Sequence, residues 1–421
     1  MLSLTSRQWR EAKGGVLQRS QIVTKFEFNL DGFISMNQIR IYEDKLYKNG
    51  LADFGMPLLG SLDAHLVWNR DHSACAPLEN VFERLNINAL IFSQPAEPYR
   101  SIIEYLAETS SGVILPQDCE TRTFLHDLPI AYQFTEDAIV STLKERKSVI
   151  IPGHGIITYG TVSIEQAFVT FSSVCFACFV KFFCDALLNS KKGGLDDRQQ
   201  QVFDQVVKAL DPPVSFDRSL LKGPFDSETK VYAAIQEAGR LAVEHRLVDS
   251  FFGNISFCYG DTLFISQTGS SLDNLKSCID PCPLDGTSCA GITASSELPA
   301  HLKIVKNTEN NAILHGHPKF SVILSMDCEI ENCDCSGKCH IKCPHERFVC
   351  GIPVVSGEVG SGPHGLYKTV PKALKNGPGV IVYGHGLFTV GVDDFNQPFK
   401  NLLEIENNCR MEYFNRIKNL G

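Results

Sequence analysis

The sequence lacks an excess of positive charge. Its 421 residues contain 39 lysines and arginines against 48 aspartates and glutamates, which gives a formal net charge of −9 and a pI near 5.8. The basic residues are scattered, so we expect no basic face of the kind that attracts nucleic-acid phosphates or acidic lipid head groups. Neither a nucleic acid nor a membrane is therefore expected as a partner.

Long apolar runs are missing as well. No run reaches the roughly 18 apolar residues of a membrane span, and the most apolar stretch, residues 168–183, is interrupted by polar residues such as Ser172 and Lys181. This pattern predicts a buried helix. The first residues are basic but lack the apolar segment of a secretory signal. We expect a cytoplasmic protein, with organelle targeting by the basic start as the alternative.

Two segments of the chain, about 230 residues apart, have similar sequences. Asn88-Ala-Leu-Ile-Phe-Ser-Gln-Pro95 is similar to Asn311-Ala-Ile-Leu-His-Gly-His-Pro318, and residues 153–183 align with residues 384–414 without a gap. Each copy has an apolar run, a Gly-His-Gly turn, a short apolar segment and a helical pattern. This order predicts strand, turn, strand and helix twice, and such a repeat indicates an internal duplication.

The length and the 43% hydrophobic content allow two domains with a core each. A segment rich in Lys, Gly, Asp and Pro separates the copies, and it contains an amphipathic pattern that predicts a helix over residues 197–210. We therefore predict a first domain over residues 1–190, a linker over residues 191–224 and a second domain over residues 225–421.

Three histidines of the second copy form a candidate metal site. His315 and His317 come at the end of a predicted strand, and because side chains alternate along a strand, both imidazoles point to the same side. His385 lies between two glycines at the predicted turn. Three imidazoles with an open fourth position are typical of a catalytic zinc site. A lone His-x-His motif would more simply be a pair of structural polar residues.

Five segments of the second copy together resemble the class II aldolase/adducin family, in their order and approximate spacing over about residues 228–418. They are Gly253-Asn-Ile-Ser256, Thr268-Gly-Ser-Ser271, Ser295-Ser-Glu297, His315-Gly-His-Pro318 and Gly384-His-Gly-Leu387. The resemblance implies a three-layer α/β/α domain, and the duplication implies a second, degenerate copy of it before the linker.

The resemblance also implies roles for individual residues. One zinc ion per chain would be held by His315, His317 and His385, with Glu297 as the catalytic acid and base. The substrate phosphate would be bound by short polar residues and a glycine: Asn254, Thr268, Gly269, Ser295 and Ser296. Hydroxyl, amide and backbone N–H groups of this kind are suited to a phosphate dianion.

The implied function is that of a zinc-dependent aldolase, a lyase that cleaves or forms a carbon–carbon bond in a small phosphorylated sugar through a metal-stabilised enediolate. One family feature is unmatched, since no equivalent is found for the tyrosine that a neighbouring subunit supplies. Two alternatives stay open. One is a dehydratase-like lyase acting on methylthioribulose 1-phosphate, and the other is a non-catalytic, adducin-like binding or scaffold protein.

The first copy lacks most of these features. Phe92 and Gln94 stand where the second copy has two histidines, and the Thr-Gly-Ser-Ser and Ser-Ser-Glu segments have no counterpart. His154 alone remains, and we assign it a structural role because one imidazole rarely holds zinc. Because family enzymes form fourfold rings, we expect a homo-oligomer, namely a pseudo-fourfold dimer in which the degenerate domain walls the active site.

The chain is not short of cysteine, since it has 16. Several of them crowd into residues 328–350, where thiolates could hold a second zinc ion or an iron–sulfur cluster. Their spacing matches neither the ferredoxin pattern nor paired Cys-x-x-Cys zinc motifs, so buried or free thiols are the alternative. Cys175 and Cys178 lie in the apolar helix and are expected to pack in a core.

Overall fold

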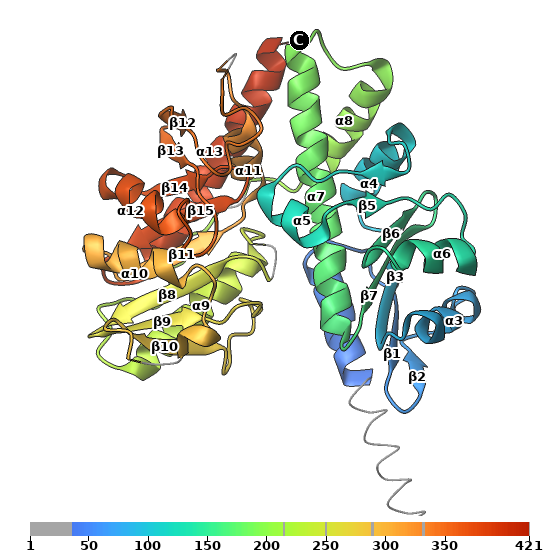
Figure 1. Ribbon diagram of the computed structural model, residues 1–421, viewed down its shortest axis with the longest axis horizontal. Helices are drawn as coiled ribbons and strands as arrows, with labels where there is room; N and C mark the ends of the chain where they lie inside the picture. Colours follow the sequence, from blue (N-terminus) through green and yellow to red (C-terminus); the bar gives the residue numbers. More distant parts are fainter. Residues whose placement is uncertain (1–35, 214, 249–250, 288–289, 331–332, 421) are drawn as a thin grey trace, which may run out of the picture. The chain divides into compact units, whose positions relative to one another are not determined.

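A computed structural model describes residues 36–213, 215–248, 251–287, 290–330 and 333–420 (Figure 1). The chain forms two compact units. The first comprises Met1–Tyr47, Ala52–Gln94 and Ala131–Phe171, and the second comprises Lys48–Leu51, Pro95–Ile130 and Ser172–Gly421. This division cuts across the domain predicted for residues 1–190, because residues 95–130 and 172–190 belong with the second unit.

The first unit contains a five-stranded antiparallel sheet in the order β2-β1-β3-β7-β6. Its strands are β1 (Leu58–Leu62), β2 (Leu66–Trp68), β3 (Ala89–Ser93), β6 (Ser148–Ile151) and β7 (Gly155–Gly160). The helices α3 (Cys75–Leu85) and α6 (Glu136–Leu143) bury their apolar sides, including Leu78 and Ile139, against strand residues such as Leu90 and Val149. A further helical segment covers residues 36–48.

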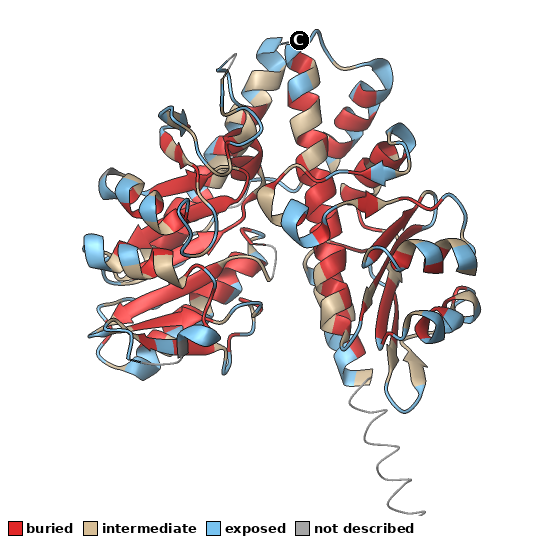
Figure 2. Cartoon of the chain, in the orientation of Figure 1, coloured by how far each residue is buried: buried red, intermediate tan, exposed pale blue. Residues whose placement is uncertain are grey.

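The second unit contains an eight-stranded sheet in the order β10-β9-β8-β11-β15-β14-β13-β12. Neighbouring strands are antiparallel except for β13 and β14. The strands are β8 (Asn254–Tyr259), β9 (Thr262–Ser266), β10 (Ile279–Pro283), β11 (Ala312–Gly316), β12 (Arg347–Val349), β13 (Ile352–Val355), β14 (Gly379–Val382) and β15 (Gly386–Gly391). In Figure 2 this sheet is almost entirely buried.

Helices cover both faces of this sheet. On one face, α10 (Leu298–Asn307), α12 (Val370–Ala373) and the short 3₁₀ turns at Leu366–Lys368 and Leu374–Asn376 pack on alternate strand residues such as Ile313 and Phe388. On the other face, α9 (Glu228–Glu244), α11 (Lys319–Met326) and α13 (Asn396–Leu420) contact β8, β14 and β15. The predicted three-layer α/β/α domain is therefore confirmed for this half of the chain. A 3₁₀ turn at Ala290–Ile292 precedes α10.

Residues 95–130 add a small substructure to the second unit. It consists of α4 (Tyr99–Thr109), α5 (Cys119–Leu125) and the antiparallel strand pair β4 (Val113–Ile114) and β5 (Leu128–Pro129). The helix α8 (Asp197–Ala209) packs on α4 and matches the helix predicted in the linker. It begins where the Asp196 carboxylate accepts a hydrogen bond from the Gln199 amide at 2.7 Å, as an N-cap residue does.

The apolar stretch 168–183 lies in α7 (Ile164–Lys191). This helix is long and apolar enough to cross a membrane, but 83% of its most apolar window is buried inside the protein. Its later turns belong to an aromatic cluster of the second unit, where Phe183 packs on Phe320 and on Tyr413, whose hydroxyl donates to the Phe183 carbonyl at 2.8 Å. The predicted buried helix is confirmed.

The two sheets share strand order and register. β2-β1-β3-β7-β6 corresponds to β9-β8-β11-β15-β14. In both sheets an alanine at the start of one central strand pairs with a glycine at the end of the next, Ala89 with Gly160 and Ala312 with Gly391. A duplication predicts this agreement, since the same residues of each copy should pair.

Candidate metal centre

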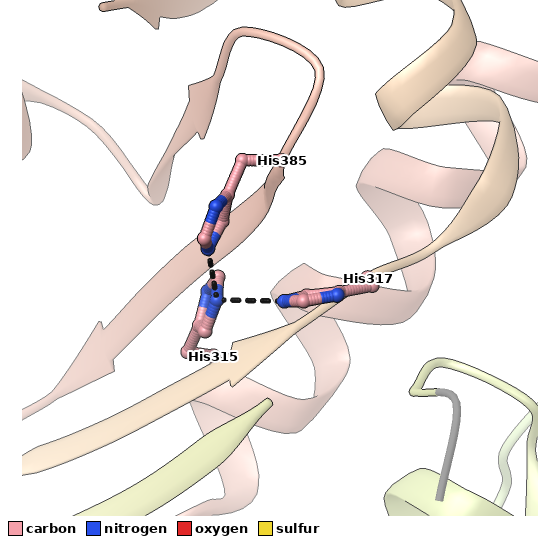
Figure 3. A group of neighbouring side chains, drawn as sticks. All are labelled: His315, His317 and His385. Atoms are coloured by element: carbon pink, nitrogen blue, oxygen red, sulfur yellow. Dashed lines mark hydrogen bonds between the residues drawn. The ribbon is translucent and has the colours of Figure 1, made fainter. Parts of the chain in front are cut away.

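Three imidazoles from two elements converge in the second unit. His315 is near the end of β11, His317 follows that strand, and His385 lies in the turn between β14 and β15 (Figure 3). The Nε2 atom of His315 is 3.0 Å from Nε2 of His317 and 3.2 Å from Nε2 of His385. All three side chains are buried. The convergence predicted from the sequence is thus present in the structure.

Strand pairing and one glycine allow this close approach. β11 and β15 pair so that His315 lies opposite Phe388, and its ring stacks on that phenyl ring with centroids 4.0 Å apart. A Cβ atom on Gly386 would lie 2.7 Å from ring carbons of both His315 and His317 and 2.5 Å from the Gly316 carbonyl oxygen. Only glycine can therefore occupy this position without moving the imidazoles.

Hydrogen bonds fix which ring nitrogen faces the centre. Nδ1 of His315 is 3.2 Å from the Leu387 carbonyl oxygen, and Nδ1 of His385 is 3.1 Å from Oε1 of Glu120. Both partners are acceptors, so each Nδ1 carries the proton. Each Nε2 then faces the other imidazoles, and in the neutral ring it is the nitrogen whose lone pair can bind a metal.

A second carboxylate lies among the imidazoles. Glu297 precedes α10 and its side chain makes no capping bond to that helix. Its Oε1 is 3.1 Å from Nε2 of His385, and its Oε2 is 3.3 Å from Nε2 of His315. The Asn254 side-chain amide donates to Oε2 at 2.6 Å. The predicted catalytic residue is therefore adjacent to the predicted ligands.

Neighbouring side chains on β8 hold the Glu297 carboxylate and His301 at the start of α10. Asn254 and Ser256 point to the same side of β8, because side chains alternate along a strand. Glu297 and His301 are four residues apart and lie one above the other at the start of α10. Asn254 accordingly bonds Glu297, and the Ser256 hydroxyl lies 2.7 Å from Nδ1 of His301. The His301 amide also donates to the Glu297 carbonyl at 3.2 Å, which ties the two residues together at the start of the helix.

Burial and charge set the protonation of the cluster. Burial lowers the pKa of His315 to about 4 and holds that of His317 well below its usual range. Burial also disfavours the charged form of His385, but the carboxylates of Glu120 and Glu297 outweigh it and raise the pKa to about 9. For Glu297, burial opposes ionisation, whereas His315 and His385 hold the pKa well below its usual range. The metal-free centre therefore contains an ionised Glu297 carboxylate, neutral imidazoles at His315 and His317, and a protonated imidazole at His385.

These residues fit a zinc ion. The three candidate ligand atoms lie within 4.8 Å of one another, and a cation between the three rings would take the place of the proton on His385. The buried Oε1 atom of Glu297 has no hydrogen-bond partner among the described residues. Three imidazole nitrogens with a carboxylate oxygen alongside are a ligand set that zinc accepts.

The predicted phosphate-binding residues lie at neighbouring strand ends. Gln267 and Ala294 form an isolated bridge, and the Thr268 hydroxyl donates to the Ala294 carbonyl at 3.0 Å, so residues 268–269 are adjacent to residues 295–296. The Ser295 hydroxyl accepts from the Glu297 amide at 3.3 Å. Asn254 and Ser295 are buried, whereas Thr268, Gly269 and Ser296 are exposed.

The cysteine-rich segment 328–350 does not form a second centre of this kind. In the part of the chain that the structure describes, which includes all six cysteines of this segment, the only group of three or more converging candidate ligands is the histidine cluster. The sulfur atoms of Cys339 and Cys343 instead donate to backbone carbonyls within the segment, at 3.4 and 3.6 Å. The crowding of cysteines had raised the possibility of a metal site, whereas these two thiols are directed at the backbone.

Two contacts were not predicted from the sequence. Glu120, from α5, contacts His385, and Phe252 stacks on His317 with ring centroids 6.0 Å apart. Phe252 also contacts Phe124 of α5, with centroids 5.6 Å apart. Neither residue is part of a spaced motif, so only the tertiary structure reveals them.

Comparison with known proteins points to the same half of the chain. Residues 233–413 match the family model of the class II aldolase and adducin N-terminal domain. An L-fuculose phosphate aldolase from Methanococcus maripaludis is 28% identical over 156 residues, which are 37% of this chain and 81% of that protein.

Solved structures give a similar result. The L-fuculose-1-phosphate aldolase from Thermus thermophilus is 22% identical with a TM-score of 0.37, and the match covers 45% of this chain and 96% of that one. A sugar-phosphate aldolase from Thermotoga maritima is 20% identical with a TM-score of 0.34, covering 46% and 97%. On the five sequence motifs and the family-model match, the carboxy-terminal half of this chain belongs to the class II aldolase and adducin family.

Proposed function

We propose that the carboxy-terminal domain is a zinc-dependent aldolase that cleaves or forms a carbon–carbon bond in a small phosphorylated sugar. One observation carries the proposal: His315, His317 and His385 direct their Nε2 atoms at one point inside the protein, with the Glu297 carboxylate beside them. A protein that served only as a scaffold would gain nothing from burying three such imidazoles together, since their desolvation costs free energy.

The three histidines would hold the ion and leave further coordination positions to the substrate. Bound there, zinc would supply a Lewis acid that polarises a substrate carbonyl and stabilises the negative charge that develops during bond cleavage. Glu297 would move the proton. Asn254 holds one oxygen of this carboxylate at 2.6 Å, while the other oxygen lies 3.1 Å from Nε2 of His385 and would be the one that accepts a substrate proton once that nitrogen binds the metal.

The substrate class follows from the residues next to Glu297. Gly269 and Ser296 are exposed beside the start of α10 and offer a backbone N–H and a hydroxyl, while the exposed Thr268 beside them donates its own hydroxyl to the Ala294 carbonyl. Donors of this kind suit a phosphate dianion. The similar protein from Methanococcus maripaludis is an L-fuculose phosphate aldolase, which supports a phosphorylated sugar as the substrate. We further propose a cytoplasmic homo-oligomer, with the pseudo-fourfold dimer as its simplest form.

The replacement Glu297→Gln tests this function. The purified wild type and the variant would be loaded with zinc, their metal content measured, and release of dihydroxyacetone phosphate followed with a panel of ketose 1-phosphates. We expect one zinc ion per chain in both, because the imidazoles remain, and a loss of roughly 10²–10⁴-fold in kcat in the variant, because the proton carrier is gone.

Glu108→Gln is the matched control. Glu108 is an exposed carboxylate on α4 that pairs with Arg198 at 2.7 Å, so its replacement should change neither zinc content nor rate. Wild-type protein that binds no zinc and releases no product from any sugar phosphate would contradict the proposal and favour an adducin-like binding role. Zinc binding with another product would point to the dehydratase alternative.

A further inference from the structure

A helix of the amino-terminal copy begins against the turn that contains His385. The Cys119 amide donates to the Gly384 carbonyl at 2.6 Å, and the Cys119 thiol donates to the Tyr383 carbonyl at 3.4 Å. The next residue, Glu120, has its Oε1 atom 3.1 Å from Nδ1 of His385. Two successive residues of α5 thus contact three successive residues of the turn, Tyr383, Gly384 and His385.

The start of α5 is itself well fixed. The buried Asp118 carboxylate caps the helix by accepting from the Thr121 amide at 2.8 Å and from the Thr121 hydroxyl. Burial raises the pKa of the Asp118 carboxyl to about 6, and the two Thr121 bonds counter this effect. Because the cap sets the backbone of the first turn, it also sets the direction of the Glu120 side chain.

Glu120 is distinct from Glu297 in what it can touch. Glu297 lies on the Nε2 side of His385, where the three imidazoles meet, whereas Glu120 lies on the opposite, Nδ1 side. A carboxylate on the outer nitrogen accepts the ring proton, fixes the tautomer and the ring orientation, and makes the inner nitrogen a better donor to a metal. The two carboxylates therefore cannot exchange roles.

We propose that Glu120 is a positioning residue of the metal centre, supplied by the otherwise degenerate amino-terminal copy to His385 of the carboxy-terminal copy. This inference rests on the proposed zinc site. It gives the first copy a function in the second: residues 95–130, which sequence assigns to the first domain, pack in the unit that contains the histidines. The first copy lacks counterparts of His315 and His317, yet its Glu120 places a carboxylate beside His385 of the second copy.

The proposal predicts a graded response of metal affinity. Glu120→Ala removes both the hydrogen-bond acceptor and the charge, so the zinc dissociation constant should rise by roughly 10–100-fold, as when other outer-shell partners are lost. Glu120→Gln keeps an oxygen that can accept from Nδ1, so its effect should be smaller. Thr123→Ala is the control, because Thr123 is exposed on the same helix and bonds only the Cys119 carbonyl among its described contacts, at 2.8 Å.

Competition with a chromophoric chelator would give the zinc affinities of the four proteins. Cobalt loaded in place of zinc supplies a second readout, since its visible absorption reports on ligand geometry. We expect the cobalt spectrum of Glu120→Ala to differ from the wild type and that of Thr123→Ala to match it. Circular dichroism of the metal-free proteins identifies any variant that fails to fold, in which case Glu120→Gln against Thr123→Ala decides the question.

The outcomes separate this inference from the proposed function. If wild-type protein binds no zinc, the proposed metal site fails and the inference fails with it. If the wild type binds zinc and both Glu120 variants bind it with unchanged affinity and unchanged cobalt spectra, only the role of Glu120 is overturned. Weakened binding in Thr123→Ala as well would also overturn it, because α5 would then act merely as a packing element.

Discussion

The two Gly-His-Gly turns of this protein have the same backbone setting and different surroundings. Each follows one strand and begins the next, with Ile151 paired to Gly155 in the first copy and Val382 paired to Gly386 in the second. His385 is buried among imidazoles and carboxylates, whereas His154 is exposed and stacks on Phe134 with ring centroids 5.0 Å apart. A conserved fold position thus does not determine the chemistry of the side chain that occupies it.

The neighbouring strands explain this difference. In the second copy Asn254 pairs with His315, and both side chains contribute to the centre. At the same register in the first copy Leu58 pairs with Phe92. Apolar residues at these positions extend the core of the first unit, in which Leu58 is a buried member and Phe92 packs against it. At these registered positions one sheet has polar residues of the candidate metal centre and the other has apolar residues of a packed core.

The largest expected effect comes from giving the second copy a residue of the first. His315→Phe reproduces the side chain of the equivalent Phe92, and the new ring can stack on Phe388 as the imidazole does. Zinc affinity should fall by more than the roughly 10–100-fold that the loss of an outer-shell partner costs, because a direct ligand is removed. Measured zinc content and product release should disappear together.

The reverse change provides the check. Phe92→His restores one imidazole to the first copy but leaves Gln94 and the exposed His154, so this variant should bind no additional zinc. A second equivalent of tightly bound zinc in Phe92→His would break the comparison, since it would show that the first copy needs only one side chain to regain a site.

A smaller effect is expected from Asn254→Leu, which reproduces Leu58. The replacement deprives the buried Oε2 of Glu297 of the amide that donates to it at 2.6 Å. A buried acceptor left without its donor costs about 1–3 kcal/mol, so the free energy of unfolding of the metal-free protein should fall by that amount in urea titrations.

The first copy supplies a matched control for this loss. Asn80 donates to Glu136 at 2.9 Å in the same amide-to-carboxylate arrangement, but the pair is exposed. Water can replace the lost donor there, so Asn80→Leu should change the free energy of unfolding by less than about 0.5 kcal/mol. Equal decreases in the free energy of unfolding of Asn254→Leu and Asn80→Leu would mean that burial of Glu297 does not determine the cost of losing its amide donor.

The sequence was sufficient for the features that depend on local pattern. Apolar runs around the Gly-His-Gly turns indicated the central strands of both copies, and the motif order indicated the α/β/α architecture of the second. Strand alternation placed His315 and His317 on one side of a strand. His385 is 70 positions from His315 and was joined to this pair through the family resemblance, and in the structure the pairing of β11 with β15 brings them together.

The contacts that sequence reasoning missed depend on long-range packing. Glu120 reaches His385 only because residues 95–130 join the second unit, and the thiol and carbonyl of the neighbouring contact are 264 positions apart. No periodicity or spacing encodes such a pairing. For the cysteine-rich segment, crowding of the residues raised the possibility of a metal site although their spacing matched no known pattern, and the directions of the Cys339 and Cys343 thiols depend on turns such as Cys335–Lys338 that spacing cannot reveal.

The smallest expected effect concerns the imidazole that the first copy retains. His154→Ala removes an exposed ring whose described aromatic contact is Phe134, so the free energy of unfolding should change by no more than about 0.5 kcal/mol, and zinc content should equal that of the wild type. Metal analysis and urea titration of this variant beside His385→Ala would measure the difference between the two turns directly. Reduced zinc in His154→Ala would mean that the first copy takes part in metal binding through its own turn, and the sharp division of chemistry between the copies would then have to be abandoned.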